Sequence, residues 1–187
     1  LNSRGLRASS AVNVARFSPN IYDGPAIMFP AMDENGKIQG IQSVLLTPEG
    51  KKRDHNGISK YSRGVIAGNV MRIGDEHDGA AIIMVEGPED ALSVHQAVGG
   101  NIQSTIVCTF GKAGMSTYNV PRASDVTICA DPDLDVDNVA DVLAGDGSTS
   151  VYVVRFDQLG VEHAKDANDY LPEAGADKLR TPPATPT

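Results

Sequence analysis

The sequence lacks several features that mark whole classes of protein. No apolar run approaches the roughly 20 residues that a membrane helix needs, and no secretory signal is visible. Its two cysteines, Cys108 and Cys129, lie in apolar strand-like runs without metal-ligand spacing, which excludes a zinc ribbon. We expect both to be buried thiols of a protein in a reducing compartment.

Positive charge is scarce in one part of the chain. The 187 residues carry a net charge of −8, yet residues 1–80 hold ten Lys and Arg against eight Asp and Glu, whereas residues 81–187 hold six against sixteen. Such acidity argues against a protein that simply coats nucleic acid. A cation site made of carboxylates, next to a mildly basic part that touches the phosphate backbone, would explain this distribution of charge. Because the chain begins with Leu1, we expect it to be a fragment of a longer protein.

The first part of the chain has the pattern of a β-meander. Two extended runs, 26–32 and 38–46, are joined by Asp33-Glu34-Asn35-Gly36, which has the turn residues of a hairpin. The stretch 51–68 is basic and shows no clear periodicity, so we predict a loop region there. We assign residues 1–79 to a smaller mixed α+β subdomain.

The second part alternates strand and helix signals, which is typical of an α/β protein with a parallel sheet. We predict strands at 80–85, 105–109, 126–130 and 150–156, helices at 88–98, 136–144 and near 166–171, and a helix or loop at 114–120. Residues 80–173 therefore form the α/β domain. Residues 174–187 are rich in Pro and Thr and form a flexible tail.

Acidic residues directly follow two of these predicted strands. Glu86 ends the run 80–85, and Asp131 and Asp133 follow the run 126–130. In open α/β sheets the ligand binds beyond the carboxyl ends of the strands, so these side chains should point into one crevice. Carboxylates gathered in a small volume need a cation, which predicts a magnesium site. Turn formation and helix capping are the structural alternatives for the same acids.

Three rival motifs do not fit. Asp131-x-Asp133-x-Asp135 begins like a calcium-binding hand, but Val136 stands where the tight turn needs Gly and Val142 stands where an acid is needed. Gly111-Lys112-Ala113-Gly114 lacks the spacing of an ATPase phosphate loop. The Gly-rich fingerprint of a dinucleotide-binding fold is also missing.

Four short motifs together carry a family resemblance. Residues 80–172 resemble the Toprim domain of primases through Glu86-Gly87-Pro88-Glu89-Asp90-Ala91-Leu92, Thr109-Phe110-Gly111, Ala130-Asp131-Pro132-Asp133 and Lys165-Asp166-Ala167-Asn168-Asp169-Tyr170-Leu171. The last motif looks most like phage and plasmid primases and primase-helicases. Residues 16–74 look, more loosely, like the segment that precedes Toprim in those proteins.

The resemblance implies a Rossmann-like sheet and a DNA primase, which makes short RNA primers from nucleoside triphosphates (NTPs). It implies catalytic roles for Glu86, Asp131 and Asp133, which with Asp90 and Asp135 would hold Mg²⁺ or Mn²⁺. Two such ions can stabilise the attacking and leaving oxygens of nucleotidyl transfer. Glu86 stays open between metal ligand and proton-transfer group, and Asp135 could equally serve the first turn of the following helix.

Other residues are candidates for binding the substrates. Lys112 and Lys165 each follow a strand and, with Asp166, are our candidates for the triphosphate. For a single-stranded DNA template the candidates are Arg16, Lys51, Lys52, Arg53, Lys60, Arg63 and Arg72. We also expect a helicase in the same or a partner chain, no membrane partner, and a place in the cytoplasm of a bacterial cell, where phage or plasmid could encode the protein.

Two other functions remain open on the sequence alone. A Toprim nuclease or strand-breaking enzyme would use the same acids, and it would nick DNA or need a reactive tyrosine from another domain. A non-catalytic nucleic-acid-binding module of a larger protein would instead use the acids for a structural metal. Nicking of supercoiled DNA separates the first from a primase, and strand binding without nucleotide incorporation separates the second.

Overall fold

A computed structural model of the chain describes residues 14–75, 77–98, 104–122, 124–145, 147, 149–155 and 167. The chain divides into two compact units, Leu1–Met71 and Arg72–Thr187. From the sequence we predicted a boundary between residues 79 and 80, and the short strand after residue 70 was not recognised there. Within the described residues, no helix combines the length and apolar character needed to cross a membrane.

The first unit is built on a four-stranded antiparallel sheet whose strands follow sequence order. They are β1 (Arg16–Ser18), β2 (Ala26–Met32), β3 (Ile38–Leu45) and β4 (Lys60–Gly64). The predicted hairpin of β2 and β3 is confirmed. Its turn forms because the Asp33 carboxylate accepts hydrogen bonds from the backbone N–H groups of Asn35 and Lys37, while Gly36 adopts a positive φ of 75°.

The two faces of this sheet differ in burial. One face carries Ile27, Phe29 and Val44, which are buried and form the core of the unit. On the other face, the apolar residues Met28, Pro30 and Ile41 are only half-buried. We call this second side the open face of the first sheet.

The strand β4 was not predicted, and the loop expected over 51–68 is wrong at residues 60–64. Sequence periodicity failed here because β4 is an edge strand on which Lys60, Ser62 and Arg63 are exposed, so no apolar alternation marks it. Close approach of the β3 and β4 backbones at two glycines marks the position of this strand. Gly64 pairs with Gly40, and a Cβ added at Gly40 would lie 2.5 Å from the carbonyl oxygen of Val65.

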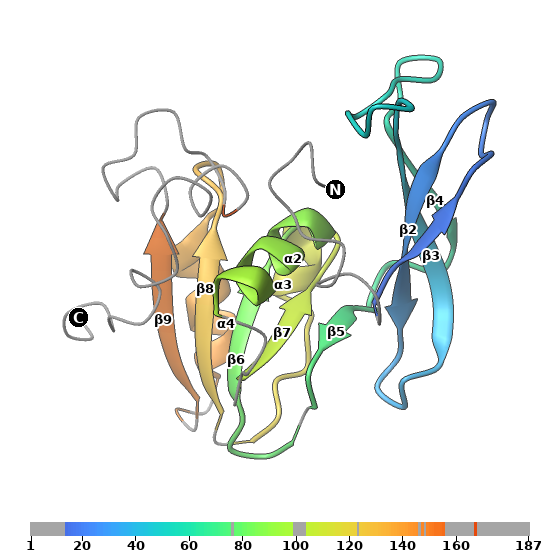
Figure 1. Cartoon of the computed structure of the whole chain (residues 1–187). Coiled ribbons are helices and arrows are strands. Elements are labelled where there is room, and N and C mark those ends of the chain that lie inside the picture. Colours follow the sequence, from blue (N-terminus) through green and yellow to red (C-terminus); the bar gives the residue numbers. More distant parts are fainter. Residues whose placement is uncertain are drawn as a thin grey trace. The chain divides into compact units, whose positions relative to one another are not determined.

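The second unit holds a five-stranded sheet in the order β5 (Met71–Ile73), β7 (Ser104–Cys108), β6 (Ala81–Val85), β8 (Asp125–Ala130) and β9 (Ser150–Arg155). The pairs β6–β7, β6–β8 and β8–β9 are parallel. The helices are α2 (Pro88–Ala97), α3 (Lys112–Met115) and α4 (Val136–Ala144). Because β6-to-β7 and β8-to-β9 cross the sheet in opposite directions, right-handed connections put α2 and α4 on opposite faces (Figure 1).

These elements confirm the predicted α/β fold and the four predicted strands of the parallel sheet to within about two residues. The helix or loop expected at 114–120 is the short helix α3, which begins earlier, at Lys112. Side chains on both faces of the central strands are buried, Ile82 and Ile128 on one face and Val85 and Cys129 on the other, as a doubly covered sheet requires. Except for Ala167, the predicted helix at 166–171 and the tail 174–187 lie outside the described residues.

Gly40→Ala tests the pairing of β3 with β4. We expect the variant to lower the free energy of unfolding by about 2 kcal/mol, because the new methyl group meets the backbone of Val65 rather than a yielding side chain. Urea denaturation followed by circular dichroism measures the loss. Ser62→Ala on exposed β4 is the control, with a change below about 0.5 kcal/mol. Equal midpoints for Gly40→Ala and the parent chain would contradict this register.

Candidate metal centre

Three neighbouring parallel strands end at one edge of the second sheet. The register pairs Val85 of β6 with Cys108 of β7, and Met84 of β6 with Ile128 of β8. The residues just beyond these strands therefore lie side by side. They are Glu86 after β6, the loop that leads to Lys112 after β7, and Asp131 after β8.

Glu86 stands at the junction between β6 and α2. Its Oε2 atom is buried and has no hydrogen-bond partner in the described structure. A buried carboxylate oxygen without a donor is costly, so it is suited to receive a cation. The following helix begins with Gly87 as N-cap and Pro88 in the first turn, and a Cβ at Gly87 would lie 2.6 Å from Oδ2 of Asp90. Glycine thus lets the Asp90 carboxylate fold back toward the end of β6.

The acids after β8 divide between two roles. Asp131 is half-buried at the strand end, and its carbonyl accepts a 3.1 Å hydrogen bond from the N–H of Leu134. Asp133 is exposed on the resulting turn. Asp135 is the N-cap of α4, where its carboxylate accepts a 3.3 Å hydrogen bond from the N–H of Asn138. The structure therefore gives Asp135 the helix-capping role that the sequence had left open, and a metal role for it stays a prediction.

The loop between β7 and α3 has an uncommon backbone. Phe110 adopts a positive φ of 58° and Gly111 one of 144°. The Thr109 hydroxyl group contacts the carbonyl oxygens of Val85 and Gly111 at 3.4 and 3.0 Å, and Gly114 approaches the carbonyl of Thr109 so closely that an added Cβ would lie 2.5 Å away. Such strained, tightly held loops concentrate at functional sites. This one fixes the start of α3, and with it Lys112.

Lys112 carries its positive charge into the group of acids. Its Nζ forms an ion pair with the Asp133 carboxylate and donates a 3.4 Å hydrogen bond to the Asp133 carbonyl. The hydrogen bond to Asp133 raises the pKa of Lys112, burial opposes the rise, and the negative charges of Asp133, Glu86 and Asp131 add to it. The same hydrogen bond lowers the pKa of Asp133.

The pKa of Cys129 in β8 also responds to acids at these strand ends. Burial is the main cause that raises the pKa of its thiol to about 12, and the negative charges of Asp90 and Asp131 contribute to the same rise. The thiol therefore stays protonated near neutral pH and acts as an apolar core residue. Asp90, from α2, and Asp131, from the end of β8, thus act on one interior point.

These observations bring Glu86, Asp131 and Asp133 into one electrostatic neighbourhood, with Asp90 close to the same strand ends. In the described residues, no three acidic, His or Cys side chains gather closely enough to form a ready metal site. The donor set nevertheless fits a hard cation, because it is made of carboxylates and includes the unpartnered Oε2 of Glu86. Glu86, Asp131 and Asp133 are thus the candidates to hold Mg²⁺ or Mn²⁺.

The remaining predicted site residues are spread over the chain. Lys165 and Asp166 lie outside the described residues. Arg16 and Arg63 lie on the open face of the first sheet, because Arg16 pairs with Met28 and Arg63 with Ile41. Lys60 pairs with buried Val44 and thus belongs to the other face.

The other predicted template-binding residues lie between β3 and β4 or on β5. Lys51 and Lys52 are exposed in the segment that follows β3. Arg53 instead donates hydrogen bonds to the carbonyl oxygens of Leu46, at 3.1 Å, and Ile21, at 2.9 Å. Its guanidinium group therefore ties two segments of the first unit together. Arg72 is half-buried on β5 in the second unit.

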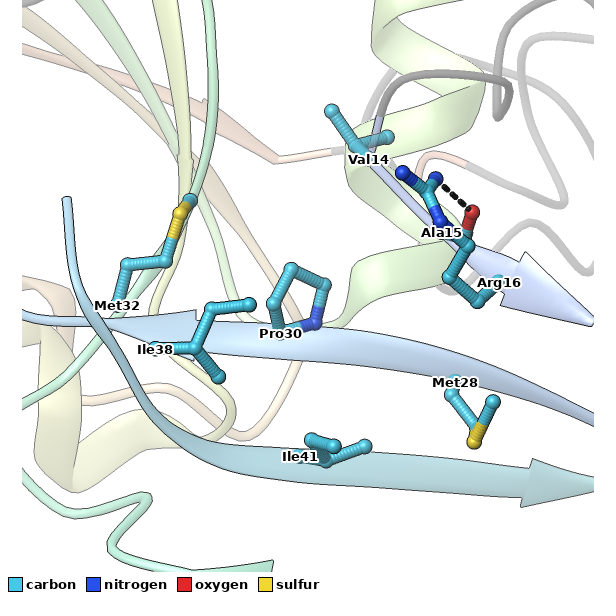
Figure 2. A pocket seen from close by; sticks show the side chains of 8 residues that line it. All are labelled: Val14, Ala15, Arg16, Met28, Pro30, Met32, Ile38 and Ile41. Atoms are coloured by element: carbon cyan, nitrogen blue, oxygen red, sulfur yellow. Dashed lines mark hydrogen bonds between the residues drawn. The ribbon is translucent and has the colours of Figure 1, made fainter.

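The open face of the first sheet also holds an apolar groove that the sequence did not predict. Its volume is about 230 Å³, and its lining consists of Val14, Ala15, Arg16, Met28, Pro30, Met32, Ile38 and Ile41 (Figure 2). Arg16 donates a 2.9 Å hydrogen bond to the carbonyl of Ala15, drawn in Figure 2. The signal available in the sequence was that both alternating sets of positions in 26–32 are apolar.

Two comparisons relate this sequence to known proteins. The model of the Toprim domain family matches residues 81–177, which is 97 of the 187 residues. The matched segment contains the ends of β6, β7 and β8 and all the acids described above. A search of curated proteins found no match.

Solved primase structures share the fold of the chain. The primase fragment of the bacteriophage T7 primase-helicase protein superposes with a TM-score of 0.60 at 14% identity, over 90% of this chain and 67% of that one. A DNA primase domain from Pseudomonas aeruginosa gives 0.60 at 16% identity, over 96% and 68%. A third chain, from a bacteriophage T7 structure of lagging-strand DNA polymerase and primase domains bound to an RNA/DNA hybrid and dTTP, gives 0.58 at 15% identity, over 90% and 82%. At sequence identities this low, the superpositions show a common fold and nothing more.

Lys112→Met tests whether the ammonium group lies among the metal-binding acids. Removing one positive charge from the cluster should strengthen Mn²⁺ binding about fivefold, because the carboxylates lose a competing cation. Electron paramagnetic resonance of free Mn²⁺ measures the affinity without any enzymatic step. Lys37→Met in the exposed β2–β3 turn makes the same change in net charge and should leave the Mn²⁺ affinity unaltered. Unchanged or weaker binding by Lys112→Met would contradict the arrangement.

Proposed function

We propose that this chain, which belongs to the Toprim domain family, is the catalytic core of a DNA primase that makes short RNA primers from NTPs on single-stranded DNA. The family match confirms the resemblance found in the sequence. One observation carries the proposal: the Lys112 ammonium pairs with Asp133 and is within the electrostatic influence of Glu86 and Asp131, in a chain that shares its fold with solved primase domains.

In this proposal each acid has a defined task. Glu86, Asp131 and Asp133 would hold the divalent cations, and Asp90 would add negative charge beside them. When bound, such ions supply positive charge to the attacking and leaving oxygens of nucleotidyl transfer. Glu86 also lies where it could accept a proton from a 3′-hydroxyl group, because its Oε2 is buried and has no hydrogen-bond donor in the described structure.

Basic residues would hold the two substrates. Lys112 lies beside the acids and would move from Asp133 to the triphosphate of an incoming NTP, since a triphosphate carries more negative charge than a single carboxylate. Lys165 and Asp166 are further candidates for that substrate. The template would lie on the basic first unit. The T7 neighbour is part of a primase-helicase protein, and we propose a helicase partner for this chain too.

Asp131→Asn tests the catalytic assignment. The variant keeps the size of the side chain and removes its charge, so we expect synthesis to fall about 100-fold or more while the fold is kept. Incorporation of labelled ribonucleotides on single-stranded DNA with Mg²⁺ or Mn²⁺ measures the effect. Glu86→Gln should behave alike. Asp141→Asn, on the exposed side of α4, makes the same chemical change away from the site and should retain activity.

Two further measurements make this experiment decisive. Circular dichroism of each variant shows that loss of activity is not loss of structure. Supercoiled DNA incubated with the chain and Mg²⁺ tests the nuclease alternative. Synthesis by Asp131→Asn at the parental rate, or nicking without nucleotide incorporation by the parent chain, would overturn the primase assignment.

A further inference from the structure

Three aromatic rings gather on the first unit, far apart in sequence. The ring of Tyr22 stacks on that of His55, with centroids 5.2 Å apart and planes 21° apart, and it lies 4.5 Å from the ring of Tyr61. The Tyr61 hydroxyl donates a 2.7 Å hydrogen bond to the carbonyl of His55. Tyr22 is nevertheless 49% exposed. We call Tyr22, His55 and Tyr61 the aromatic cluster.

The backbone that carries Tyr22 is strained. Tyr22 and Asp23 have φ values of 49° and 61°, and the N–H of Ile21 donates a 2.6 Å hydrogen bond to the carbonyl of Gly24. Two consecutive residues with positive φ form the kind of turn in which Asn-Gly is usual, and a bulky ring is uncommon there.

The same chain shows the ordinary solution at a second turn. Asn56 and Gly57, with φ values of 54° and 78°, connect His55 to Ile58, which exchange backbone hydrogen bonds of 3.0 and 3.1 Å. Two turns with similar φ values thus meet at the aromatic cluster. Only the Tyr22 turn places an exposed aromatic residue at a strained position, which suggests that the ring itself is needed there.

Arg53 holds the strained turn in place. Its Nη2 donates a hydrogen bond to the carbonyl of Ile21, at the start of the turn, and its Nε donates one to Leu46 at the end of β3. Gly24 lets the guanidinium group approach, since an added Cβ would lie 2.8 Å from Arg53 Nε. The hydrogen bonds of Arg53, which we predicted to bind the template, thus position the turn that carries Tyr22.

The surroundings of the cluster favour a polyanion with flat rings. The segment 51–63, which carries His55 and Tyr61, contains five Lys and Arg and a single acid, Asp54, in a protein whose net charge is −8. Of the five, Lys60 belongs to the other face of the sheet and Arg53 is bonded to carbonyl oxygens. Tyr61 pairs with Ser43, two residues from Ile41, so Tyr61, Arg63 and the apolar groove share the open face. Cations beside an exposed aromatic surface are the combination that binds single-stranded nucleic acid.

We propose that the aromatic cluster is a stacking platform for bases of single-stranded DNA, with Tyr22 as the ring that meets the base. Arg63 on the same face would contact the phosphates. Asp23, exposed beside Tyr22, disfavours a phosphate at the ring itself and thereby favours a base. That the strand is a template rests on the proposed function, whereas the platform itself does not.

Tyr22→Leu removes the ring and keeps an apolar side chain. We expect it to bind a fluorescein-labelled oligothymidylate about tenfold more weakly than the parent chain in anisotropy titrations. Tyr22→Phe keeps the ring and should bind as the parent does. Phe17→Leu is the matched control, because Phe17 is a 67% exposed aromatic residue one position from Arg16 and so on the opposite face of the sheet. Phe17→Leu should also bind as the parent does.

Salt dependence separates stacking from charge. Stacking releases no counterions, so the logarithm of affinity against the logarithm of salt concentration should have the same slope for Tyr22→Leu and the parent chain. Arg63→Gln should have a shallower slope. A strand that contains 2-aminopurine should be quenched by the parent chain and by Tyr22→Phe, but less by Tyr22→Leu. Equal affinity and equal quenching for Tyr22→Leu and the parent would overturn the platform.

The platform and the primase assignment fail in different ways. Asp131→Asn should bind the oligonucleotide normally while synthesis is lost. A parent chain that binds through Tyr22 but incorporates no nucleotide would refute the proposed function and leave the platform standing. If the parent chain makes primers and Tyr22→Leu binds the oligonucleotide as tightly as the parent does, the platform alone is refuted. Thermal melting of Tyr22→Leu and Tyr22→Phe checks that both are folded.

Discussion

The arrangement depends on one constraint, the parallel register that makes β7, β6 and β8 end together. Because Val85 is level with Cys108 and Met84 with Ile128, the residues that follow these strands lie at the same edge of the sheet. Two strand ends deliver carboxylates and the third delivers Lys112. One ammonium group cannot neutralise Glu86, Asp131 and Asp133 together, so the cluster retains an excess of negative charge. That excess is the physical basis for expecting divalent cations here.

Two backbone segments are strained where they position a functional side chain. Phe110 has a positive φ at the loop that leads to Lys112, and Tyr22 has one at the aromatic cluster. In each segment a glycine makes room for a close approach: Gly114 approaches the carbonyl of Thr109, and Gly24 approaches the guanidinium group of Arg53. Both segments are held by hydrogen bonds to nearby carbonyl oxygens, from Thr109 and from Arg53. Strain of this kind persists only where the neighbouring structure over-determines it.

The sequence predicted those parts of the molecule that local pattern encodes. Buried strands β6 and β8 are continuous apolar runs that stop abruptly at an acid, so both the strands and Glu86 and Asp131 could be recognised. β4 could not, because an exposed edge strand needs no apolar alternation. Lys112 and its ion-pair partner Asp133 are 21 positions apart in the sequence, and Tyr22 and its stacking partner His55 are 33 positions apart. No periodic signal connects the members of either pair. Such pairs follow from turn geometry, which a single sequence specifies only weakly.

The uneven charge of the chain bears on how it would hold a nucleic acid. A protein with a net charge of −8 repels a polyanion at long range, and the five cations of segment 51–63 offset this only locally. Arg53, one of the five, is already engaged with backbone carbonyls. Phosphate contacts alone would then give weak binding that salt easily abolishes. In the proposed platform, stacking of bases on Tyr22 would add affinity that salt does not screen, which would account for a strained, exposed ring on the basic unit.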